Sequence, residues 1–227
     1  VETVCKKKIG RDVYLYVPEG ISLVSKRMLS KLCISLETHD LRTVPDPHSC
    51  VIVIVDTSSS YHVGELSGYI DKTVKGLVII DHHDTGDLIG KAVIEMIQAG
   101  RPSASEIISS LYNMFNNCPP PSIATLLLSG ILYDSRRFLN VVPDTFNQVY
   151  YLIDKCGADY GSALAALAPP PQVYSERIAH LKALQRLEIY RLNDDIIIAL
   201  TNVGSYESSV ARLLIAVSYT HLTLPTN

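Results

Sequence analysis

The chain has 227 residues, of which 47% are hydrophobic and 19% charged, and this balance excludes disordered and fibrous proteins. Its length suits one α/β domain and part of a second, because single hydrophobic cores usually serve about 100 to 200 residues. A net charge of -3 excludes a general basic field of the kind that holds long nucleic acid by counterion release.

The location of the protein is predicted from its apolar runs and its cysteines. No apolar run reaches the roughly 18 residues needed to span a bilayer, and Val1 begins neither a signal peptide nor a transit pattern. The five cysteines form no Cys-x-x-Cys pair and would leave one over in any disulfide scheme, so we expect reduced thiols. Together these features favour a cytoplasmic protein without membrane partners.

The first elements in chain order are two short strands around a helix. Residues 12–17 alternate, are rich in Val and Tyr, and stop at a Pro-Glu-Gly break, which predicts a strand and a loop. A helix is expected from Ser25 to Leu32, because its apolar residues share one face. Cys33 to Leu36 then predicts a brief strand.

Two β-branched runs decide the fold class. Residues 51–55 end at Asp56 and residues 77–80 end at Asp81, and continuous runs of this kind predict strands buried on both faces. In open parallel sheets, ligands bind beyond the carboxyl ends of the strands. The two aspartates therefore lie where a site is expected.

Helical patterns fill most of the remaining chain. They are expected at residues 105–116, 122–132, 144–155, 160–167 and 172–187. A hairpin (188–192 and 195–201) and a helix (208–216) follow them.

The predicted fold is α/β: a doubly wound parallel sheet, a helical linker and an incomplete second α/β domain. The triple proline at 169–171 marks the domain boundary. The first domain is expected at residues 1–168, the linker helix at 169–187 and the start of the second domain at 188–217. Residues 218–227 are expected to be a non-native tail, because their sequence follows none of the periodic patterns of the preceding chain.

The triplet Asp81-His82-His83 is the strongest local signal for chemistry. Imidazole and carboxylate together suit borderline divalent metals such as Mn²⁺ and Zn²⁺. Adjacent residues on a strand point to opposite faces, so both histidines reach one site only if the chain turns there, with Asp81 orienting an imidazole. The alternative for the triplet alone is a solvated loop.

Three spaced motifs together resemble the DHH phosphoesterase family. They are Val55-Asp56-Thr57-Ser58, Asp81-His82-His83, and the segment Gly130 to Phe138 around Asp134, in the family's order. The resemblance implies a hydrolase with two Mn²⁺ ions, or Mg²⁺, in its complete site. Asp56 would bridge the ions, His82 and Asp134 would bind one of them, and His83, aided by Asp81, would act on the substrate or its leaving group.

The family's first motif, an Asp-x-Asp cluster at the end of the first strand, is not found between Val1 and Arg11. Either the fragment starts after that motif, or the site is degenerate. Truncation at both ends is the simpler interpretation, and it predicts that this chain alone binds metal poorly and can be inactive. The same resemblance identifies residues 188–217 as the start of the family's associated substrate-binding domain.

The function implied is hydrolysis of short oligonucleotides, or of 3'-phosphoadenosine 5'-phosphate, by a water activated between two metals, as in nano-RNase-like members. Arg136 and Arg137 are candidates for binding the substrate phosphate, because a guanidinium fork matches phosphate oxygens. The equally expected alternative is that they form ion pairs at the surface. The alternatives are a RecJ-like single-strand exonuclease, a pyrophosphatase or exopolyphosphatase, and a non-catalytic nucleotide-binding module. The resemblance also leaves a homodimer open.

Overall fold

The computed structural model describes residues 12–43, 46, 49–70, 76–168, 172–193 and 196–218. The chain forms two compact units, Val1–Ala168 and Pro169–Asn227. The region searched for the first motif, residues 1–11, and nearly all of the suspected tail lie outside the described residues. None of the described helices combines the length and the apolar composition needed to cross a bilayer.

A parallel sheet organises the first unit and confirms the α/β prediction. Its strands are β1 (Ile52–Val55), β2 (Leu77–Asp81) and β3 (Ile94–Ile97), in the order β1-β2-β3. Val55 lies beside Ile80 in the register, so β1 and β2 end within one residue of each other. Strand β3 was not predicted, because its short Ile-Glu-Met-Ile run shows neither a β-branched stretch nor a clear alternation.

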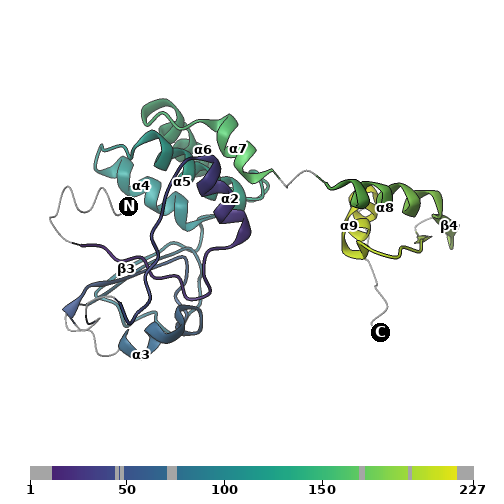
Figure 1. Cartoon of the computed structure of the whole chain (residues 1–227). Helices are drawn as coiled ribbons and strands as arrows, with labels where there is room; N and C mark the ends of the chain where they lie inside the picture. Colours follow the sequence, from purple (N-terminus) through teal and green to yellow (C-terminus); the bar gives the residue numbers. More distant parts are fainter. Residues whose placement is uncertain are drawn as a thin grey trace. The chain divides into compact units, whose positions relative to one another are not determined.

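One face of the sheet packs against the segment that joins β1 to β2. This segment contains the 3₁₀ helix η2 (Ser60–Leu66) and helix α3 (Ser67–Ile70). The core residues on this face are Ile52, Ile54, Val63, Ile70, Leu77, Ile79 and Leu88. In Figure 1, α3 lies on one side of the strands and α4 to α7 gather on the other, as in a doubly wound fold.

The expectation that β1 is buried on both faces is wrong. Its burial alternates, and Val53 and Val55 remain 53% and 45% exposed. The reason is its place at the edge of the described sheet, since helix α4 packs against β2. A β-branched composition alone does not distinguish an edge strand from a central one.

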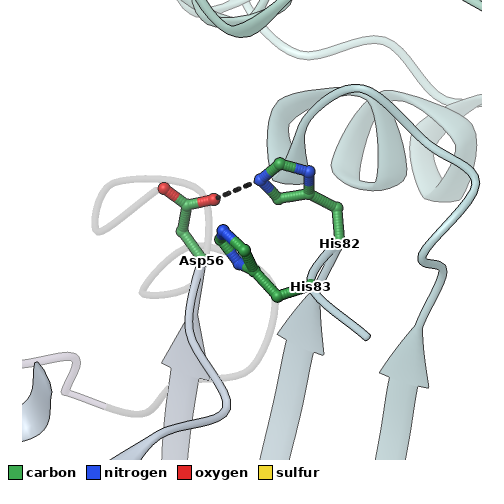
Figure 2. Close-up of side chains that lie close together, drawn as sticks. All are labelled: Asp56, His82 and His83. Atoms are coloured by element: carbon green, nitrogen blue, oxygen red, sulfur yellow. Dashed lines mark ion pairs between the residues drawn. The ribbon is translucent and has the colours of Figure 1, made fainter. Parts of the chain in front are cut away.

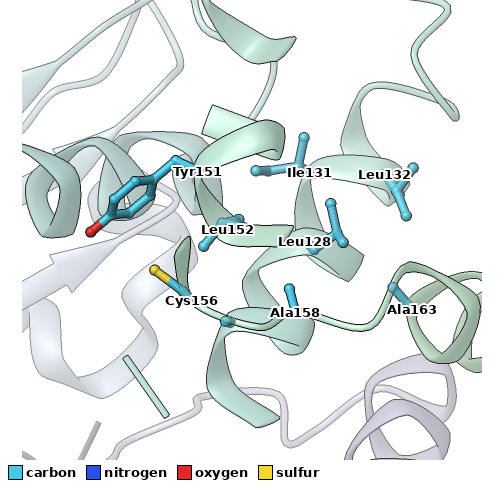
Figure 3. Packing of buried hydrophobic residues seen from close by; sticks show 9 residues of the cluster. Leu128, Ile131, Leu132, Tyr151, Leu152, Cys156, Ala158 and Ala163 are labelled. Atoms are coloured by element: carbon cyan, nitrogen blue, oxygen red, sulfur yellow. The ribbon is translucent and has the colours of Figure 1, made fainter. Parts of the chain in front are cut away.

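Helices build a second core beside the sheet. They are α4 (Ala104–Met114), α5 (Pro121–Asp134), α6 (Pro143–Tyr150), the π-helical turn η3 (Tyr151–Lys155) and α7 (Tyr160–Leu167). Their shared cluster includes Leu128, Ile131, Leu132 and Leu152, each fully buried (Figure 3). Helix α2 (Leu23–Lys31) packs on α7, and Lys31 Nζ donates to the carbonyl of Ala165 at 2.5 Å.

Two short strands predicted near the start of the chain are absent from the described residues. Residues 12–17 form no strand, and the Leu15 carbonyl accepts from the backbone N–H of His39, at 2.8 Å, which lies outside any strand. Cys33 has a left-handed φ of 53° and follows directly on the end of α2, so residues 33–36 begin with a turn. Alternating apolar residues form a strand only where a partner strand is available.

The expectation of reduced cysteines is wrong for one pair. Cys118, in the loop between α4 and α5, and Cys156, at the end of η3, form a disulfide across a sequence separation of 38. Cys33 and Cys50 take part in no disulfide within the described residues. The pairing arises from tertiary packing, so cysteine spacing could not reveal it.

The second unit contains two helices and a hairpin. They are α8 (Tyr174–Gln185), the antiparallel strands β4 (Glu188–Arg191) and β5 (Ile197–Leu200), and α9 (Glu207–Ser218), which confirms the predicted hairpin. Its buried residues are His180, Ala183, Val210 and Ala211. Its identity as the start of a substrate-binding domain stays a prediction.

Candidate metal centre

Asp56 stands at the carboxyl end of β1, where the chain leaves the sheet. Its backbone N–H donates to the Ile80 carbonyl at 2.9 Å, which extends the pairing with β2 by one residue. Its φ of 68° is left-handed, a conformation that aspartate tolerates better than most residues. The turn thus begins at the acidic residue itself and holds Asp56 beside the end of β2.

Asp81 is the buried centre of the site. Its side chain is 0% exposed, and its Oδ1 accepts from the N–H of His82 at 2.8 Å, the N–H of His83 at 3.3 Å and His83 Nδ1 at 2.8 Å. Burial alone would raise the pKa of Asp81, but the hydrogen bonds from the ring and the backbone of His83 outweigh it and the pKa is lowered. The carboxylate therefore turns the chain and anchors both histidines.

The two histidines come together with Asp56. His82 Nε2 lies 3.4 Å from Asp56 Oδ1, and the rings of His82 and His83 have centroids 4.3 Å apart (Figure 2). One ligand atom from each of these three residues lies within 4.8 Å of the others. Imidazole nitrogens with a carboxylate oxygen suit Mn²⁺ or Zn²⁺, so the donor set fits the expected ion.

Of the two imidazoles, that of His83 has the stronger hydrogen-bond partner. The hydrogen bond from its ring to the Asp81 carboxylate is the main cause that raises the pKa of His83, and the charges of Asp56 and Asp134 act in the same direction. Its side chain is 56% exposed, so the ring faces solvent as well as the carboxylates. Part of the ring is therefore accessible from solvent.

Asp134 lies at the edge of this group. It is the last residue of α5, and it is not among the three residues whose ligand atoms lie within 4.8 Å of one another. Asp134 is exposed, but desolvation by the surrounding groups still raises its pKa, the charge of Asp56 raises it further, and the two histidines oppose them. Desolvation raises the pKa of Asp56 as well, the two histidines oppose it, and the charge of Asp81 adds to it. Two carboxyl groups that share such surroundings favour a neutralising cation.

The loops behind the site are locked together, which the sequence did not reveal. The Leu88 N–H donates to the Ser58 carbonyl at 3.0 Å, and Ser58 Oγ donates to the Thr85 carbonyl at 3.2 Å. Ser60 donates to both carboxylate oxygens of Asp87, at 2.8 Å from its N–H and 2.5 Å from its hydroxyl. These bonds fix the segment after Asp56 against the segment after His83.

Arg136 and Arg137, which follow Asp134 in the chain, have an unusual backbone conformation. With Phe138 they have left-handed φ angles of 51°, 57° and 70°, and their turn is held by the Arg137 N–H, which donates to the Leu132 carbonyl at 2.7 Å. Both side chains are exposed, and within the described part of the chain neither forms an ion pair. The surface ion pairs considered from the sequence are therefore not seen there.

A parallel sheet whose strand ends gather a carboxylate and two imidazoles is typical of a metal-dependent enzyme. Residues 3–131, more than half of the chain, match the DHH family, N-terminal domain. The chain belongs to the DHH family, whose members are metal-dependent hydrolases.

Two relatives define the extent of the similarity. An uncharacterized protein of Methanocaldococcus jannaschii is 30% identical over 200 residues, which is 88% of this chain and 57% of that protein. The crystal structure of an exopolyphosphatase-related protein from Bacteroides fragilis aligns with a TM-score of 0.51 at 18% identity, over 62% of this chain and 41% of that one. The second likeness shows a shared fold, and the chain spans little more than half of the first relative.

Proposed function

We propose that this chain carries the metal-binding part of an Mn²⁺-dependent phosphoesterase that hydrolyses short oligonucleotides or 3'-phosphoadenosine 5'-phosphate. The observation that carries the proposal is the group formed by Asp56, His82 and His83, whose ligand atoms lie within 4.8 Å of one another. Membership of a family of metal-dependent hydrolases supports it.

In this proposal the residues of the group have different roles. Asp56 and His82 hold the ion, and Asp134 completes its ligands from the end of α5. Bound divalent ions would activate a water and stabilise the charge that develops on phosphoryl oxygens. His83 meets the substrate or its leaving group, since its ring is exposed and is oriented by Asp81.

Arg136 and Arg137 are proposed to bind the substrate phosphate. Their guanidinium groups are exposed and form no ion pair in the described structure, and they follow a metal-site residue directly. A guanidinium fork matches the geometry of phosphate oxygens. The net charge of -3 favours a short substrate, because a long one needs an extended basic surface.

The test is a hydrolysis assay on the purified full-length protein that contains this chain, with Mn²⁺ and with a chelator. The substrates are a dinucleotide, 3'-phosphoadenosine 5'-phosphate, pyrophosphate, polyphosphate and a long single-stranded oligonucleotide. We expect Mn²⁺-dependent cleavage of the first two, abolished in Asp56→Asn. The matched control is Asp84→Asn, which removes an exposed carboxylate next to the motif and should retain activity.

Other outcomes identify the alternatives. Phosphate release from pyrophosphate or polyphosphate alone would make the protein a pyrophosphatase or exopolyphosphatase, and preference for the long strand would make it a RecJ-like exonuclease. If calorimetry detected nucleotide binding but no substrate were hydrolysed, the protein would be a nucleotide-binding module and not an enzyme.

A further inference from the structure

The carbonyl oxygen of Arg101 contacts one of the proposed metal ligands. It lies 3.3 Å from His82 Nδ1, on the opposite side of the ring from the Nε2 that faces Asp56. A carbonyl oxygen only accepts hydrogen bonds, so this contact places the proton on Nδ1. Nε2 faces the Asp56 carboxylate, which also only accepts hydrogen bonds, so a cation between the two would use the Nε2 lone pair that this tautomer provides.

The side chain of Arg101 ties that carbonyl to three parts of the first unit. Its Nη1 donates to Glu106 Oε1 at 2.6 Å and to Asp144 Oδ2, and its Nε donates to Gln98 Oε1 at 3.1 Å. Glu106 is fully buried at the start of α4, and Asp144 lies in the first turn of α6. Nε and Nη1 of the guanidinium are thus occupied by protein oxygens.

The backbone around Arg101 adds to this restraint. The Arg101 N–H donates to the Gln98 carbonyl, and the Gln98 N–H donates to the Asp81 carbonyl, both at 2.9 Å. Ser103 Oγ caps α4 by accepting from the Glu106 N–H at 3.1 Å. The loop from β3 to α4 is therefore fixed at both ends and, through Arg101, in its middle.

We infer that Arg101 is a positioning residue of the metal centre: its ion pairs with Glu106 and Asp144 hold its own carbonyl against His82 and so select the tautomer and the orientation of that ligand. The inference rests on the proposed metal site. It assigns no contact with substrate to Arg101.

The test compares variants by three measurements: Mn²⁺ affinity by calorimetry, melting temperature in chelator, and the His82 tautomer by long-range proton–nitrogen NMR of the metal-free chain. Arg101→Gln should lower Mn²⁺ affinity by about 10- to 100-fold, the usual cost of losing a group that orients a ligand. It should also lower the melting temperature, because the buried Glu106 carboxylate loses its partner.

A second variant separates positioning from stability. Arg101→Gln combined with Glu106→Gln removes the unpaired buried charge, so we expect the melting temperature to recover while Mn²⁺ affinity stays low and the His82 tautomers remain mixed. Arg101→Lys keeps the positive charge but loses the forked geometry of the guanidinium. Its Mn²⁺ affinity should therefore lie between those of the wild type and Arg101→Gln. The control is Arg42→Gln, which breaks the exposed pair with Asp40 (3.4 Å) and should change none of the three.

Recovery of affinity together with the melting temperature in the double variant, or an unchanged tautomer in Arg101→Gln, would overturn the inference. A wild-type chain that binds no Mn²⁺ would instead count against the proposed function, and the tautomer of the metal-free chain would still decide the role of Arg101.

Discussion

At the scale of single residues, Asp81 and His83 form a pair whose strength depends on pH. The pKa of His83 is raised by its hydrogen bond to Asp81, and the pKa of Asp81 is lowered in return. A raised histidine pKa contributes stability that is fully present below its unfolded value and is lost as pH rises through the folded value. A lowered aspartate pKa contributes stability above its unfolded value that is lost as pH falls through the folded one.

The stability prediction from this pair concerns His83→Gln in the metal-free chain. We expect the variant to melt about 2 to 4 °C below the wild type, since a half-exposed pair contributes up to about 1 kcal/mol. The gap should be widest between about pH 4 and pH 6.5, the ordinary values of the two groups, and should close at higher and at lower pH. The measurement is thermal denaturation in chelator across pH.

His62→Gln is the matched control for this window. The ring of His62 contacts the neutral Thr57 hydroxyl, at 3.2 Å from Nδ1, so its replacement should give no such window. If the melting temperature of His83→Gln lay below that of the wild type by the same amount at every pH, the ring would contribute by packing and not by charge.

At the scale of elements, the loops after β1 and β2 touch at Gly86. A Cβ at this position would lie 2.3 Å from the Ser58 carbonyl oxygen, which is backbone and cannot rotate away. We expect Gly86→Ala to push the two loops apart, to destabilise the chain by about 1 to 3 kcal/mol, and to weaken Mn²⁺ binding. Denaturant unfolding and calorimetry would measure the two effects.

Gly68→Ala serves as the comparison, because a Cβ there meets nothing within 4 Å. In helix α3 this change should be neutral or slightly stabilising, by up to about 1 kcal/mol. If Gly86→Ala kept both wild-type stability and Mn²⁺ affinity, the lock between the loops would have no role in the site.

Gly130 lies at a close contact between α4 and α5. A Cβ there would lie 2.1 Å from Ser105 Oγ and 2.9 Å from Ser105 Cβ. Gly130→Ala should therefore cost about 1 to 3 kcal/mol, and adding Ser105→Gly should recover part of that loss. Chemical denaturation of the single and double variants gives the coupling energy, and strict additivity would show that the helices have room to separate.

The sequence predicted those elements whose signals are local. β1 and β2 are β-branched runs, and α5 and α7 are bounded by proline breaks or caps, so their positions follow from short-range rules. The same rules failed at residues 12–17, where alternation was present but no strand partner lies among the described residues. The sequence did not predict β3, because its residues show no strand pattern. They form a strand because they pair with β2.

The candidate site divides in the same way. Asp56, Asp81, His82 and His83 could be predicted because they follow strand ends, where parallel sheets place their ligands. Arg101 could not, because its role depends on a carbonyl and on ion pairs with residues of α4 and α6. The bonds between Ser58 and the loop after β2 are likewise tertiary, and no spacing in the sequence indicates them.

At the scale of the whole molecule, each unit has its own buried residues. The first unit contains the sheet core, the helical core and the disulfide, whereas the second buries residues of α8 and α9. Hydrogen bonds within the second unit include Thr201 Oγ1 to the Ala183 carbonyl at 2.6 Å and His180 Nε2 to Ser209 Oγ at 2.9 Å. A covalent constraint in one unit should therefore act on that unit alone.

Reduction of the Cys118–Cys156 disulfide tests this separation. The bond closes a loop of 38 residues that contains α5 and α6, and the chain-entropy estimate for such a loop is about 4 kcal/mol. We expect a reductant, or Cys118→Ser, to lower the free energy of unfolding of the first unit by up to that amount. Hydrogen exchange should become faster in α5 and η3 and stay unchanged in α8 and α9. Faster exchange in α8 after reduction would show that the two units unfold together, and an unchanged first unit would show that the bond does not constrain its unfolded chain.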